Sequence, residues 1–379
     1  MGTLTLDLRP GAGLGPFLLG MPVCDAFAYI DQHPDTFDAV QVKYHDEEPL
    51  LCDLVVSFPN HGFHLRFEPR SQLLQMRYAT SSIGGANIAA TFVAVYALFG
   101  PTFPGTYDME RCIYTLFYPG LSFAFPIPPQ HAVSCQGREA ELPLEFPDGT
   151  TPVMSRVCVY DSSIGGCGVG VGVGSSLKKA VLPPLPAGSL YLEEIHVKLG
   201  IELSFATGGQ TLTFGLSPQD VWTELGRPCG IQKKQVDPMV IHSASGSKQR
   251  TTICGDYFYN YFTRGIDILF DGQTNRIKKF VLHTNFPGHT DFNSYIKCNF
   301  IIDCRPSDEH IKSKYSIRPE TKWNQVKEFL GDGGRAAIQT QGSVSNPFGP
   351  TFVYSYRDIA LEVMKNGHIA TVTLFQSTP

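Results

Sequence analysis

The chain has 379 residues, of which 42% are apolar and 17% charged, and its 30 basic and 35 acidic residues give a net charge of −5. This balance excludes a disordered chain and argues against a protein that neutralises many nucleic-acid phosphates. The length exceeds one usual domain, and the 37 Gly and 28 Pro favour short strands, so a strand-rich α+β protein of two lobes is expected.

The N-terminus carries no recognisable targeting signal. MGTLTLDLRPGAGLG lacks the charged start and apolar core of a signal peptide, and Leu6 stands where myristoylation needs a hydroxyl residue. No apolar run reaches the roughly 20 residues that span a bilayer. Ten cysteines occur without a Cys-x-x-Cys pair, which indicates reduced thiols and no metal or cofactor site. A cytoplasmic protein is expected.

The first predicted elements are a short helix within 17–34 and strands at 53–59 and 62–79. A similar order follows, with a helix within 88–101 that ends at Gly100-Pro101 and two strands within 113–126. The closing strand of this second group is missing or distant in the sequence.

The clearest group lies in the second half of the chain. Residues 213–228 predict a helix capped by Ser217 and ended by Gly226, followed by strands within 256–271 and 275–285. A fourth group combines a helix at 321–332 with strands in 349–376, where Asn366-Gly367 supplies a hairpin turn.

Four copies of one helix-plus-antiparallel-sheet module are therefore predicted, packed in pairs because one copy cannot bury its apolar face alone. Residues 1–150 would form the N-terminal lobe and 206–379 the C-terminal lobe. Between them, 151–205 would supply connecting strands at 153–160 and 188–205 around a Gly/Pro-rich surface loop at 161–188.

The sequence contains no motif that supports a catalytic function. The Gly-rich run fits neither nucleotide-binding pattern, and no nucleophile elbow, kinase signature or H-E-x-x-H is present. His283, His289 and Asp291 in HTNFPGHTD are the candidates for a base, an acid and an orienting carboxylate. Histidines at strand ends are more often satisfied by neighbouring backbone, so a hydrolase is the weakest alternative.

Two surfaces of the third group are candidates for binding. The first is a partner surface on the aromatic strand, formed by Tyr257, Tyr259, Tyr261 and Phe262. The second is a basic patch that could face anionic lipid, formed by Lys233, Lys234, Lys278 and Lys279. The alternative for the lysines is a solvated sheet edge protected by charge.

Long blocks of the sequence resemble the phagosome assembly factor family. The block CGDYFYNYFTRGIDILFDGQTNRIKKFVLHTNFPGHTDFNSYIKCNFII at 254–302 resembles its signature segment. The resemblance extends through LGMPVCDAFAYI near the start, FGPTFPGTY at 99–107 and SNPFGPTFVYSYRDIALEVMKNGHIATVTLF at 345–375, and so covers most of the chain.

The resemblance implies a non-enzymatic adaptor that binds a WD-repeat β-propeller protein and acts in autophagosome assembly. It also implies recruitment to the phagophore assembly site, where the complex contacts phosphoinositide membranes. It supplies no catalytic residues to carry over. A trafficking protein that binds phosphoinositides directly is the main alternative. The module pattern is also similar to β-lactamase inhibitor protein and BamE-type proteins, which are binding scaffolds.

Overall fold

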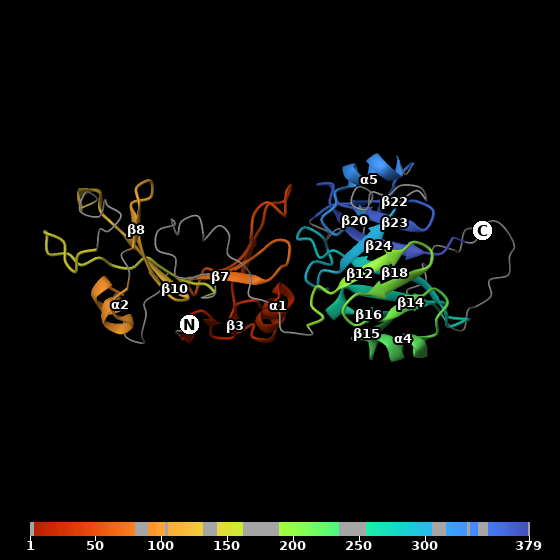
Figure 1. Cartoon of the computed structure of the whole chain (residues 1–379), viewed down its shortest axis with the longest axis horizontal. Coiled ribbons are helices and arrows are strands. Elements are labelled where there is room, and N and C mark those ends of the chain that lie inside the picture. Colours follow the sequence, from red (N-terminus) through yellow and green to blue (C-terminus); the bar gives the residue numbers. More distant parts are fainter. Residues whose placement is uncertain are drawn as a thin grey trace. The chain divides into compact units, whose positions relative to one another are not determined.

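The computed structural model describes residues 4–79, 90–102, 105–131, 142–161, 189–234, 255–304, 316–331, 334–339 and 348–377. The chain divides into two compact units, one of residues 1–45 and 50–185 and one of residues 46–49 and 186–379. Each unit is built mainly from antiparallel strands with few helices (Figure 1), which confirms the α+β class. Of the expected Gly/Pro-rich loop, residues 162–188 lie outside the described residues.

The first unit is built on an eight-stranded sheet with the order β4-β5-β6-β7-β11-β10-β9-β8, and β7 pairs with β11 at its centre. Strands β4 to β7 come after helix α1 along the chain, and strands β8 to β11 come after helix α2. A small three-stranded sheet lies near the N-terminus. The elements are β1 (Leu8–Arg9), β2 (Gly13–Leu14), β3 (Phe17–Leu18), α1 (Val23–Gln32), β4 (Gln41–Lys43), β5 (Leu54–Phe58), β6 (Phe63–Phe67), β7 (Leu74–Ala79), α2 (Phe92–Phe99), β8 (Thr106–Asp108), β9 (Ile113–Tyr118), β10 (Leu121–Pro126) and β11 (Arg156–Val159).

The second unit has an eight-stranded sheet of the same design, with the order β15-β16-β17-β18-β24-β23-β22-β21. Its halves follow helices α4 and α5. The elements are α4 (Pro218–Leu225), β15 (Gly230–Lys233), β16 (Tyr257–Tyr261), the 3-10 turn η5 (Phe262–Arg264), β17 (Ile266–Phe270), β18 (Ile277–His283), α5 (Trp323–Leu330), β21 (Ala337–Gln339), β22 (Thr351–Ser355), β23 (Ile359–Val363) and β24 (Ile369–Phe375).

A five-stranded sheet completes the second unit. It contains β14 (Thr211–Thr213), β13 (Glu202–Phe205), β12 (Glu194–Lys198), β19 (Asn299–Asp303) and β20 (Ser316–Ile317), in this order. Its apolar residues, such as Phe205 and Phe300, share one core with α4, α5 and the large sheet. The large sheet therefore buries one face against α4, α5 and the five-stranded sheet.

The structure corrects three expectations for strands. The strand expected at 153–160 to connect two lobes is β11, which closes the second group by pairing with β10 and β7. The strands expected at 188–205 are β12 and β13 of the five-stranded sheet. A short edge strand was also missed after each helix. The pairing of β11 with β7, that of β12 with β19 and the short edge strands involve distant or very short segments, which local patterning does not reveal.

Three of the helices have eight residues and share one design. Each of α2, α4 and α5 ends at a glycine and buries its fourth residue, which is Val95, Val221 or Val326. Ser217 caps α4 by accepting a hydrogen bond from the Asp220 amide at 3.3 Å, as its position predicts. The part of the chain that the structure describes contains no helix long and apolar enough to cross a membrane.

Candidate functional site

The segment at 284–298, which follows β18, packs on the large sheet of the second unit. Asp267 of β17 alternates with the core residues Ile266 and Ile268, so its side chain lies on the sheet face opposite the helices. Glu362 of β23 likewise alternates with Leu361 and Val363. Both carboxylates meet side chains of the 284–298 segment. The buried carboxylates of Asp267 and Glu362 therefore lie between the sheet and this segment.

The first buried polar cluster forms around Asp267. Its carboxylate accepts hydrogen bonds from the Tyr295 hydroxyl at 2.7 Å and from Asn260 Nδ2 at 2.8 Å, and it lies 3.1 Å from His283 Nε2. The His283 and Tyr295 rings stack with their centroids 3.7 Å apart. Burial and the neighbouring Asp267 raise the pKa of Tyr295, which therefore keeps its proton and donates. The cluster fixes the end of the segment to the sheet.

The second cluster forms around Glu362. Its carboxylate lies 3.3 Å from His289 Nε2 and accepts hydrogen bonds from the hydroxyls of Thr351 and Thr371, each at 2.7 Å. Burial alone opposes ionisation, but these partners lower the pKa of Glu362 to about 2. Burial likewise lowers the pKa of His289, but the hydrogen bond and charge of Glu362 outweigh it, and the pKa is raised. The two side chains therefore form a buried ion pair.

The structure does not unite the three proposed catalytic side chains. His283 and His289 are 6% exposed each and are paired with different carboxylates. Asp291 Oδ2 is 3.9 Å from His289 Nδ1, and its side chain is 38% exposed. The three side chains do not form one accessible site, which removes the geometry that the hydrolase alternative needs. Within the described ranges, no three metal-ligating side chains come together either.

The proposed aromatic surface is wrong for two of its residues. Tyr259 and Tyr261 are 7% and 2% exposed, because β16 directs them into the core beside Ile268 and Ile266. Tyr257 is half-buried and stacks on Phe270. Phe262, which lies beyond the strand in η5, is 38% exposed and packs on Tyr295. The pairing register, which the sequence pattern left open, decides which face of β16 is buried.

The four candidate lysines differ in their surroundings. Lys278 lies 2.9 Å from Asp271 and 3.2 Å from Asp256, and the Asp271 hydrogen bond raises its pKa. Its charge is therefore largely balanced. Lys279 lies over the Phe375 ring. Lys233 and Lys234 are exposed at the end of edge strand β15.

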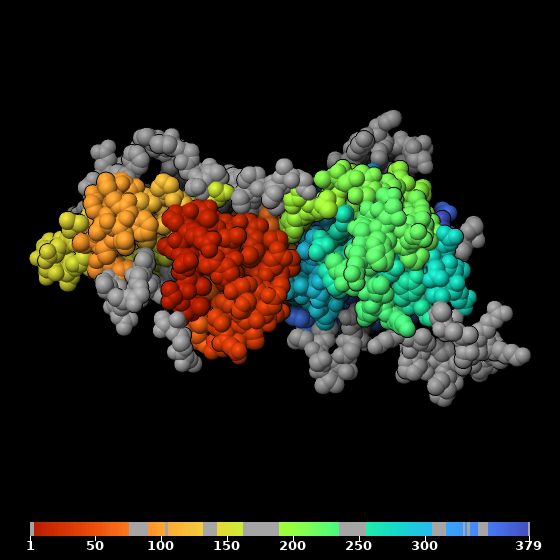
Figure 2. All heavy atoms as spheres, turned by 90° about the horizontal axis from the view of Figure 1, so that it is seen from below, coloured from red at the N-terminus to blue at the C-terminus, as the bar shows by residue number. Residues whose placement is uncertain are grey.

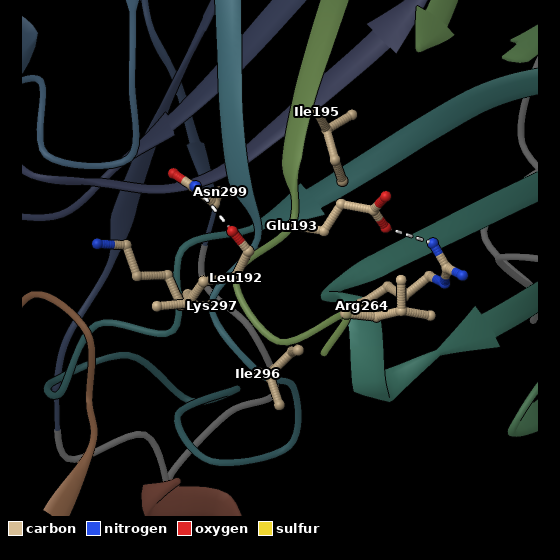
Figure 3. Close-up of a pocket in the computed structure, with 8 residues that line it drawn as sticks. Leu192, Glu193, Ile195, Arg264, Ile296, Lys297 and Asn299 are labelled. Atoms are coloured by element: carbon tan, nitrogen blue, oxygen red, sulfur yellow. Dashed lines mark hydrogen bonds and ion pairs between the residues drawn. The ribbon is translucent and has the colours of Figure 1, made fainter. Parts of the chain in front are cut away.

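One further feature of the second unit was not anticipated from the sequence. Glu193 and Arg264, 71 residues apart, form a buried ion pair of 2.8 Å beside a small cavity (Figure 3). Lys297 and Asn299 also line the cavity, and Asn299 donates to the Leu192 carbonyl. The cavity has room for about one water molecule. It therefore fits a structural ion pair better than a substrate site.

Comparisons with known proteins cover nearly the whole chain. A family model described as phagosome assembly factor 1 matches residues 13–375. The PHAF1 protein of Arabidopsis thaliana is 65% identical over 389 residues, covering 100% of this chain and 94% of that protein. The Drosophila melanogaster PHAF1 protein is 33% identical, covering 99% and 95%, and that of Caenorhabditis elegans is 30% identical, covering 95% and 90%. No solved structure matches this chain.

Proposed function

Because this chain belongs to the phagosome assembly factor 1 family, we propose that it is a non-enzymatic adaptor in autophagosome assembly that binds a WD-repeat β-propeller protein. In this proposal the chain is a cytoplasmic protein recruited to the phagophore assembly site. It uses no cofactor, and its contribution is a binding surface held in a fixed shape.

The main support for the proposal is that the buried carboxylates of the second unit hold a segment of the chain in place. Asp267 and Glu362 each hold a histidine and several further donors, and these contacts tie the 284–298 segment to the sheet. Such networks rigidify a protein when their members are satisfied. The family-specific segment that looked most catalytic therefore acts as structural support, as expected for a binding scaffold.

The order of helices and strands repeats within both units. In each half of each large sheet, one helix is followed along the chain by four antiparallel strands. We propose that these four groups are copies of one module, similar to those of β-lactamase inhibitor protein and BamE-type proteins. In those proteins the module serves binding, which agrees with an adaptor function.

The second candidate function is direct binding of phosphoinositide membranes. The exposed Lys233 and Lys234 at the end of β15 favour it, because adjacent lysines attract anionic headgroups. The paired Lys278 would contribute less.

The proposed function is tested by affinity purification of the full-length chain from its own cells, with the recovered proteins identified by mass spectrometry. We expect a WD-repeat protein to co-purify in stoichiometric amount. A chain that recovers no WD-repeat protein, but sediments with phosphoinositide vesicles when purified alone, would replace the adaptor function with the second candidate.

A further inference from the structure

The outer face of α2 in the first unit is apolar and exposed. Val93, Tyr96 and Leu98 are 45%, 42% and 71% exposed, and Ala97 is exposed between them. In Figure 2 the surface of the first unit around α2 appears as orange spheres. The helix FVAVYALF contains no charged residue, although only Phe92 and Val95 are buried. A helix that is apolar all round is normally covered on every side.

The corresponding helices of the second unit show what a solvated outer face looks like in this chain. Counted from the N-cap, the second residue is Val93 in α2 but Gln219 in α4 and Asn324 in α5. The seventh residue is Leu98 in α2 and Glu224 in α4. The seventh residue of α5 is Phe329, and Trp222 of α4 is 48% exposed, so α4 and α5 are not polar at every such position. Both helices nevertheless contain charged residues, such as Asp220 and Glu224 in α4 and Lys327 in α5, whereas α2 contains none.

The absence of charge extends beyond the helix. Residues 78–107 are 30 consecutive residues without Asp, Glu, Lys, Arg or His. At the chain average of 17%, about five charged residues would be expected in a stretch of this length. Val153, which is 47% exposed, pairs with Thr91 and extends the apolar surface past the start of the helix.

The helix is held firmly at both ends. Thr91 Oγ1 accepts a hydrogen bond from the Ala94 amide at 3.2 Å, and the Tyr118 hydroxyl donates to the Gly100 carbonyl at 2.8 Å. Phe92 packs edge-on against Phe125, and Phe99 packs on Phe123. The exposed face is thus presented by a rigid element, which lowers the entropy lost on binding.

We propose that the exposed face of α2, consisting of Val93, Tyr96, Ala97, Leu98 and the adjacent Val153, is a docking surface for a protein partner that presents an uncharged apolar groove. Val93, Tyr96 and Ala97 follow the i, i+3, i+4 spacing by which a helix occupies such a groove. The centre of a protein interface is depleted of charge and enriched in tyrosine, as this surface is. A helix that binds a lipid surface would carry lysine or arginine beside its apolar face, and none occurs in residues 78–107.

This inference rests on the proposed adaptor function and assigns the surface that performs it. The direct test uses the full-length chain and the purified WD-repeat protein recovered by affinity purification. The variant Val93→Gln/Leu98→Glu places the α4 residues on α2 and should fold, because both positions are exposed. The matched control, Gln219→Glu, adds one negative charge at the corresponding face of α4.

We expect the α2 variant to bind the WD-repeat protein at least ten-fold more weakly than wild type, and the α4 control to bind within two-fold of it, as expected for a contact in an interface centre. Equal binding by wild type and the α2 variant would overturn the docking surface while leaving the adaptor function intact. Failure of the wild type to bind would remove both proposals. A wild-type dimer that the α2 variant dissolves, or sedimentation with neutral phosphatidylcholine vesicles, would overturn this assignment in favour of a second copy or a membrane.

Discussion

Val93 of α2 and Gln219 of α4 occupy the same position in helices of equal length, the second residue after the N-cap, and Val93 is 45% exposed. Two residues further along from Val93, Val95 is 1% exposed, as is usual for the inward face of such a helix. The fold therefore buries one side of α2 and leaves the other apolar side exposed.

This contrast predicts that Val95→Ala and Val93→Ala differ in their effect on stability. Removing two buried carbons at Val95 should lower the free energy of unfolding by about 2 kcal/mol, because the contacts to the core are lost. The same change at exposed Val93 should stay within about 0.5 kcal/mol. Urea unfolding of both variants measures the difference, and equal losses would mean that both faces of α2 are packed.

Gly265 should be far less replaceable than Gly226, although both have a positive φ, of 68° and 79°. A Cβ at Gly265 would lie 2.4 Å from the Ile296 carbonyl oxygen, whereas nothing lies within 4 Å of one at Gly226. Gly226→Ala should cost about 1 kcal/mol for backbone strain alone, and Gly265→Ala several times more. Thermal unfolding of the two variants makes the comparison, and a similar shift in Tm would refute it.

The ion pair of His289 and Glu362 makes stability depend on pH in a defined way. The pKa of His289 is raised above 6.5, so its contribution is complete below 6.5 and is lost as the pH rises through the folded value. The pKa of Glu362 is lowered from 4.5 to about 2, so its contribution is present above 4.5 and is lost as the pH falls toward 2. The pair therefore stabilises the fold most between these limits.

His289→Gln should consequently lower the free energy of unfolding by about 3 kcal/mol near pH 5.5, since it leaves a buried carboxylate without its cation. The loss should become smaller as the pH rises through the raised pKa of His289, because the wild type then loses the same positive charge. Urea unfolding of both proteins at increasing pH provides the measurement. A difference that does not change with pH would show that His289 is not charged in the folded protein.

Tyr295→Phe should destabilise the protein more than Tyr257→Phe. The Tyr295 hydroxyl satisfies the buried Asp267, whereas the Tyr257 hydroxyl donates to Asn275 at an exposed position. Removing the first should cost about 1–3 kcal/mol and removing the second less than about 1 kcal/mol, because only the first leaves a buried acceptor short of a donor. Both variants keep the ring, so a reversed order in chemical denaturation would contradict the cluster described here.

Charge reversal distinguishes the lysines. If the protein binds membranes directly, Lys233→Glu/Lys234→Glu should reduce its sedimentation with phosphoinositide vesicles more than Lys278→Glu does. The reason is that Asp256 and Asp271 already balance the charge of Lys278. The single Lys278 variant should instead lose some stability, having placed three carboxylates together. Equal loss of vesicle binding in both variants would show that Lys233, Lys234 and Lys278 act as one patch.

Much of the local structure was predictable because it depends on neighbouring residues. Ser217 and Gly226 indicated the start and end of α4, and the aromatic and β-branched run at 256–271 indicated strands. The α+β class followed from the same signals. These features depend on capping and turn chemistry, which act over a few residues.

The rest depends on contacts between distant residues. The pairing of β7 with β11, and the side of β16 that is buried, follow from sheet register. The partners of His283 and His289 also come from other strands, 16 and 73 residues away. Sequence spacing placed these histidines together, whereas tertiary pairing separates them. That separation turns an apparent catalytic motif into two structural clusters.

Binding of a WD-repeat protein through an apolar surface can be measured as the affinity between the two purified full-length proteins at low and at high salt. We expect saturable binding that is nearly unchanged when NaCl is raised to about 0.5 M, because screening weakens charged contacts but not apolar ones. Absence of binding at either salt concentration, or binding that disappears as salt is added, would contradict this expectation.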